Sequence, residues 1–150
     1  FHSRNLMKLE NETDLGVIDF QDAVIGADTY DLISITRDAY VQWNAERVYT
    51  WFKMFYDVLP DAQKQERDFA QFKQDADLMA IQRHLKILGI FVRLFERDGK
   101  SGYLKDLPLV MWYLLEESKP YAELQPFMSL IHAKVLPAFE EKYGKYEVVA

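Results

Sequence analysis

The first twenty residues, FHSRNLMKLENETDLGVIDF (1–20), hold the stretch that decides the fold. Two short apolar runs, at residues 6–9 and 15–18, flank a polar cluster. Apolar runs of this length on either side of a polar turn predict two strands joined as a hairpin. Because a hairpin brings its two ends together, we expect Asn5 and Asp19 to lie side by side.

Beyond this hairpin the chain has the pattern of a helical protein. Apolar residues recur at three- and four-residue intervals, which places them on one face of a helix. Pro60 ends one such pattern, Pro126 falls in the first turn of another, and Pro108 interrupts a third. We expect a break near Asp75. The predicted helices cover residues 45–59, 104–115 and 124–139; another helix follows the capping residues 28–31, and a long amphipathic stripe continues through residues 61–98.

The composition narrows the class of protein. The 150 residues are 49% hydrophobic and 28% charged, which excludes a disordered chain. Cysteine is absent, so a disulfide scaffold, a thiolate-ligated zinc site and a cysteine nucleophile are excluded. The net charge is −6 without a basic run, which argues against a nucleic-acid partner, and no apolar stretch reaches the roughly 18 residues of a membrane span. We expect a mostly α protein of the cytoplasm, a single unit over residues 1–150, with the loop and hairpin in 1–28 and a helical subdomain in 29–150.

The chemistry of Asn5 and Asp19 indicates a metal site. An amide oxygen beside a carboxylate offers two hard oxygen ligands, which suit Mg²⁺. Such an ion bridges the phosphates of a nucleotide during phosphoryl transfer. Taken singly, either residue has an ordinary role in a turn or a cap. Their separation by 14 positions, with Asp19 at the end of a strand, favours metal binding.

Five stretches carry a resemblance to a known family: FHSRNLM (1–7), IDFQDA (18–23), GADTYDL (26–32), GKSGYL (99–104) and DLP (106–108). Together they resemble the aminoglycoside phosphotransferase and choline kinase-like family. Within it they are most similar to the bacterial anomeric sugar kinases that act on N-acetylmuramate and N-acetylglucosamine. The first three stretches are specific to the superfamily. The assignment to the subgroup rests on less specific residues in the predicted helices.

The resemblance implies roles for individual positions. The chain would be the C-terminal lobe of a protein-kinase-like α+β fold that uses ATP and Mg²⁺. Asn5 and Asp19 would bind Mg²⁺, and Asp31 would be a buried carboxylate that accepts hydrogen bonds from the catalytic loop. The catalytic Asp would be the residue immediately before Phe1, so it is absent here, as is the N-lobe. We therefore expect the chain by itself to be inactive.

The roles of several side chains have two interpretations. His2 would orient the catalytic loop or contact a substrate hydroxyl, and Asp31 would serve as a helix N-cap, a loop brace or both. Arg4 would contact phosphate or merely cover the loop with its stem. Asp38 would accept hydrogen bonds from a sugar hydroxyl or lie on a solvated helix face. The aromatic residues Trp51, Phe52 and Phe55 would stack on a sugar ring, although their helical spacing favours the core.

The sequence leaves alternatives open for the molecule that accepts the phosphoryl group. The favoured function is phosphorylation of the anomeric hydroxyl of an amino sugar in cell-wall recycling. An aminoglycoside or choline-type kinase is the first alternative, and a non-catalytic helical binding module or degenerate kinase is the second. The partners expected are a nucleotide and a small-molecule substrate. The face that would meet an N-lobe is expected to make the chain self-associate.

Overall fold

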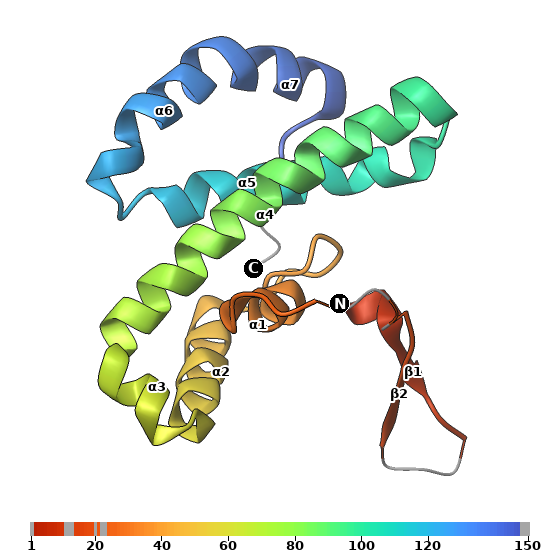
Figure 1. Ribbon diagram of the computed structural model, residues 1–150. Coiled ribbons are helices and arrows are strands. Elements are labelled where there is room, and N and C mark those ends of the chain that lie inside the picture. The colour runs from red at the N-terminus through yellow and green to blue at the C-terminus, as the bar shows by residue number, and fades with distance from the viewer. Residues whose placement is uncertain (1, 11–13, 20, 22–23, 148–150) are drawn as a thin grey trace. The chain divides into compact units, whose positions relative to one another are not determined.

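The computed structural model describes residues 2–10, 14–19, 21 and 24–147 (Figure 1). These residues are mostly helical, with a two-stranded antiparallel hairpin near the N-terminus, which confirms the predicted fold class. Phe1, Phe20, Asp22 and Ala23, which belong to the motifs quoted above, lie outside the described residues. Contacts divide the chain into two compact units, Phe1–Ala76 and Asp77–Ala150.

The first unit contains the hairpin that the sequence predicts. A 3₁₀ turn at Ser3–Asn5 leads into β1 (Leu6–Lys8), which pairs with β2 (Leu15–Val17). Leu6 lies opposite Val17. One step further out, the Asn5 carbonyl accepts a hydrogen bond of 3.0 Å from the Ile18 backbone N–H. Pairing therefore extends to the residues next to Asp19.

Three helices and the first turns of a fourth complete the first unit. They are α1 (Thr29–Thr36), α2 (Ala45–Val58), α3 (Asp61–Glu66) and the beginning of α4 (Phe69–Asp98). The Asn44 carboxamide caps α2 by accepting a 2.8 Å hydrogen bond from the Glu46 N–H. Ile33, Phe52 and Phe72 are fully buried and form the core of this unit.

The predicted helix break near Asp75 was wrong, because α4 runs through that residue without interruption. The break lies at Arg67 and Asp68, where the Asp68 carboxylate accepts a 2.8 Å hydrogen bond from the Gln71 N–H. Arg67 then ties the start of α4 to the chain before α1, through ion pairs with Asp28 and, at 2.7 Å, with Asp75. Burial lowers the pKa of Arg67, but these hydrogen-bonded carboxylates outweigh it and raise the pKa, so the guanidinium stays charged.

The second unit continues α4 and adds three helices: α5 (Leu107–Ser118), α6 (Gln125–Leu130) and α7 (Leu136–Tyr143). Pro108 lies in the first turn of α5, where its missing N–H costs no hydrogen bond, so it begins this helix rather than interrupting it. A π-helical turn at Ile131–Val135 joins α6 to α7, where the sequence predicts one regular helix. Pro137 explains it: proline has no N–H to donate to the fourth residue before it, and the Leu136 N–H bonds instead to the Ile131 carbonyl.

A buried polar pair lies in the core of the second unit. His84 is fully buried, and its Nδ1 is 2.8 Å from Oε2 of Glu117. The imidazole ring stacks on Tyr113 with ring centroids 5.0 Å apart and planes 7° apart. Among the helices of the described residues, none is both long enough and apolar enough to cross a membrane.

Gly99 ends α4 and gives a first testable prediction. Its φ of +67° lies in the left-handed region, and the N–H groups of Gly99 and Lys100 bond back to Phe95 and Leu94. We expect Gly99→Ala to lower the free energy of unfolding by about 1 kcal/mol, because alanine is strained at this φ. Gly102→Ala is the matched control, since Gly102 also has open space around it but no positive φ. Urea unfolding measures both, and equal effects of the two substitutions would contradict this explanation.

Candidate functional site

The two residues predicted to bind metal are in contact. The Asn5 side-chain amide donates a hydrogen bond of 3.2 Å to Oδ2 of Asp19. Asn5 is buried, with 5% of its surface exposed, whereas Asp19 is exposed. The other carboxylate oxygen of Asp19 accepts a 3.3 Å hydrogen bond from the Gln21 side chain. A buried amide is therefore paired with an accessible carboxylate at the open end of the hairpin.

The backbone of Asp19 is unusual. Its φ of 59° is the only positive φ of a non-glycine residue among the described residues. Such conformations cost free energy and gather at functional sites, where the surrounding structure holds a side chain in a required direction. Here the conformation occurs immediately after the strand pairing ends.

The donor set fits Mg²⁺. Asn5 and Asp19 supply an amide oxygen and a carboxylate, and Mg²⁺ in nucleotide sites takes one or two protein ligands and completes its shell with phosphate oxygens and water. Within the described part of the chain, no group of three or more His, Cys, Asp or Glu side chains is arranged to hold a metal by itself. The pair therefore supplies two ligands of a shell that phosphate oxygens and water would complete.

Asp38 is a carboxylate that braces the loop before Asn5. Asp38 is 2% exposed, and its Oδ2 accepts a 2.9 Å hydrogen bond from the Ser3 backbone N–H. Its Oδ1 accepts another, of 3.2 Å, from the Tyr40 N–H. Asp31 is exposed in the first turn of α1, so it does not occupy the buried position expected of it. The interior location of Asp38 likewise does not agree with a solvated helix face, and its two oxygens are engaged by backbone donors.

The Tyr40 ring contacts two further residues of the loop, His2 and Arg4. The His2 ring packs edge-to-face against it with centroids 5.9 Å apart, and the Arg4 guanidinium lies over the ring at 3.4 Å from its centroid. The sequence pattern alone did not indicate this contact of Tyr40 with the loop. Asp38 and Tyr40, two residues apart just beyond α1, together fix the loop that carries Asn5.

A pocket of about 410 Å³ lies between α1 and α2 in the same unit. The predicted assignment of the aromatic residues to the core holds for Phe52, which is 1% exposed, but Trp51 and Phe55 are half-buried. The Trp43 and Trp51 rings meet edge-to-face, with centroids 5.3 Å apart. The pocket is lined by Asp31, Leu32, Ile35, Thr36, Trp43, Trp51 and Phe55.

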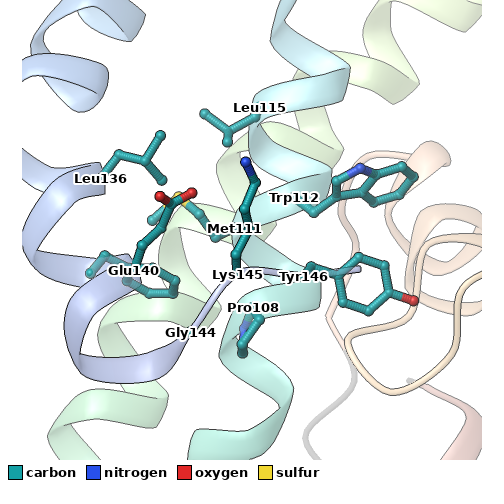
Figure 2. Close-up of a pocket in the computed structure, with 10 residues that line it drawn as sticks. Pro108, Met111, Trp112, Leu115, Leu136, Glu140, Gly144, Lys145 and Tyr146 are labelled. Carbon is teal, nitrogen blue, oxygen red and sulfur yellow. The ribbon is translucent and has the colours of Figure 1, made fainter. Parts of the chain in front are cut away.

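A second hollow lies in the other unit and is too small for a substrate. Figure 2 shows Met111, Trp112 and Leu115 on one side of it and Leu136 and Glu140 on the other. Its volume is about 40 Å³. The chain closes it after α7, where the Tyr146 ring packs against Trp112 at a centroid distance of 5.7 Å. This hollow is part of the packing of α5 against α7.

A hairpin that brings an asparagine and an aspartate together, followed by helices, has the order of elements that holds the metal in kinase-like phosphotransferases. The chain is homologous to bacterial N-acetylmuramate/N-acetylglucosamine kinases. It is 40% identical to such a kinase from Neisseria meningitidis serogroup B over 87% of its own length. It is 40% identical to one from Pseudomonas putida over 85%, and 42% identical to one from Pseudomonas aeruginosa over 74%.

The chain spans only part of these relatives: 39% of the Neisseria kinase, 38% of the Pseudomonas putida kinase and 32% of the Pseudomonas aeruginosa kinase. No protein-family model matches the chain.

Proposed function

We propose that this chain is the metal-binding, C-terminal part of an ATP- and Mg²⁺-dependent kinase that phosphorylates the anomeric hydroxyl of N-acetylglucosamine or N-acetylmuramate. The observation that carries the proposal is the contact of the buried Asn5 amide with the exposed, left-handed Asp19. It is supported by homology to proteins that bear the names of these sugars. The substrate would come from cell-wall turnover, and the protein would work in the cytoplasm, where ATP is available.

The residues of this chain position the metal and the loop. Asn5 and Asp19 would hold Mg²⁺, which when bound neutralises the phosphate charge that develops during transfer. Asp38 fixes the loop by accepting the Ser3 N–H. Arg4 is proposed to contact phosphate, because its side chain is exposed while Tyr40 holds its guanidinium in place. The expected catalytic Asp before Phe1 would accept the proton of the sugar hydroxyl.

The proposal is tested by ATP consumption in a protein of the relatives' full length that contains this sequence. N-acetylglucosamine and N-acetylmuramate are compared with kanamycin and choline as acceptors. We expect turnover with the two amino sugars and none with the two cationic acceptors. Turnover with kanamycin or choline in place of the amino sugars would overturn the choice of substrate.

The chain by itself is proposed to be inactive and to self-associate through its hairpin. Leu15 and Val17, two residues apart on β2, are 56% and 47% exposed. Alternate residues of a strand lie on the same face, so these side chains form one apolar surface.

Sedimentation at micromolar concentration tests this self-association. We expect dimers or larger species for the unmodified chain and a shift toward monomer for the double variant Leu15→Lys/Val17→Lys. Val58→Lys is the matched control, because Val58 is 79% exposed on α2 and lies outside the hairpin. A clean monomer of the unmodified chain would contradict the proposal.

A further inference from the structure

We propose that the pocket between α1 and α2 receives the pyranose ring of the amino sugar; this inference rests on the proposed function. Its volume of about 410 Å³ lies within the range of about 300–1,000 Å³ that is typical of small-molecule sites. The larger part of its lining is apolar and aromatic, with a small number of polar groups, which is the usual composition of such sites.

The aromatic wall suits a sugar ring. Trp43 and Trp51 are half-buried, and their planes make an angle of 83°. Two rings at right angles offer a flat face for the C–H bonds of a pyranose and a second surface at its edge. Leu32 and Ile35 add the apolar surface that an N-acetyl methyl group requires.

The polar group of the pocket suits hydroxyl groups. Asp31 is the only charged residue that lines it among the described residues, and its side chain is exposed. An ionised carboxylate accepts hydrogen bonds at two oxygens, so it can bind two neighbouring hydroxyls of one ring. Thr36 donates its own hydroxyl hydrogen to the Leu32 carbonyl at 2.8 Å, which leaves Asp31 as the main polar contact.

Helix α1 links this pocket to the catalytic loop. Asp31 and Thr36 lie near its two ends, and its eight residues span about 12 Å. Asp38, two residues beyond Thr36, accepts the Ser3 N–H of the loop. One short element therefore forms a wall of the pocket and positions the loop that precedes Asn5, so a sugar bound there is oriented relative to the same element as the metal pair.

The test uses the full-length protein and measures sugar binding and turnover separately. We expect Asp31→Asn and Trp51→Ala each to raise the Kd of N-acetylglucosamine in calorimetry about tenfold or more, because each removes one principal contact. The KM for ATP should not change. Trp112→Phe is the matched control, since Trp112 packs against Tyr146 in the second unit.

The outcomes separate this inference from the proposed function. If the unmodified protein phosphorylates amino sugars but both variants bind N-acetylglucosamine with an unchanged Kd, the pocket assignment is overturned. If the variants lose affinity for choline rather than for the sugar, the pocket is a cation site and the inference is equally wrong. If the unmodified protein binds the sugar but does not phosphorylate it, the proposed function fails while the pocket assignment is supported by the variants' Kd.

Discussion

Replacing Asp19 with alanine in the full-length protein is expected to lower phosphoryl transfer by about 10³-fold or more. A metal ion contributes several kcal/mol of charge stabilisation to such a transition state, and about 1.4 kcal/mol corresponds to a factor of ten in rate. Alanine leaves Asn5 as the remaining proposed protein ligand. Because Asp19 is exposed but accepts the hydrogen bond of the buried Asn5 amide, its removal should lower the free energy of unfolding by only about 1 kcal/mol.

Asp14→Ala is the matched control for this substitution. Asp14 is an exposed aspartate in the same hairpin region, so its replacement removes the same charge without touching the proposed metal pair. ATP consumption with N-acetylglucosamine is measured for both variants, and circular dichroism confirms that each is folded. Turnover of Asp19→Ala at the rate of Asp14→Ala would remove Asp19 from the mechanism.

Asp38→Ala is expected to have the largest effect on stability among the loop residues. The substitution leaves the N–H groups of Ser3 and Tyr40 without the buried carboxylate that accepts their hydrogen bonds. Losing these charge-assisted hydrogen bonds should lower the free energy of unfolding by about 3 kcal/mol. The loop before Asn5 loses its anchor at the same time, so phosphoryl transfer should also fall.

Asp31→Ala is the natural comparison for Asp38→Ala, because the sequence motif favours Asp31 and the structure favours Asp38 as the brace. Asp31 is exposed, so its replacement should change the free energy of unfolding by less than about 1 kcal/mol. Urea unfolding of both variants decides between the two residues. A larger loss of stability for Asp31→Ala than for Asp38→Ala would restore the interpretation based on the motif.

The hairpin and the proximity of Asn5 to Asp19 could be predicted because they depend on local sequence. Two apolar runs separated by a polar cluster predict a hairpin, and the register in the structure places Asn5 next to the end of the second strand. The contact between Asn5 and Asp19 follows from the pairing alone. The left-handed backbone of Asp19 does not, since it depends on where the chain must turn after the strand.

The role of Asp38 could not be predicted, because it depends on tertiary contacts. Periodicity places Asp38 at the end of a helix but does not show which chain segment packs over that end. In the structure the loop at Ser3 packs there, 35 residues away in sequence, and buries the carboxylate. The motif around Asp31 implies a buried position for this carboxylate, yet its side chain is exposed in the first turn of α1.

Helix boundaries were missed where single side chains decide them. The sequence analysis expected a break near Asp75, but Asp75 contacts Arg67 and lies within α4. The predicted helix over 124–139 contains a π-helical turn because Pro137 removes one donor. Helical spacing placed Trp51 on the apolar face of its helix, but it did not show that a pocket lies beside this residue.

The most direct test of the central claim is the metal dependence of Asp19→Cys in the full-length protein. A carboxylate prefers Mg²⁺, whereas a thiolate prefers softer ions, so a change of ligand should change the preferred metal. We predict that Asp19→Cys is inactive with Mg²⁺ and regains phosphoryl transfer to N-acetylglucosamine with Cd²⁺, while Asp14→Cys keeps the metal dependence of the unmodified protein. If Asp19→Cys shows the same metal dependence as the unmodified protein, then Asp19 does not bind the catalytic metal.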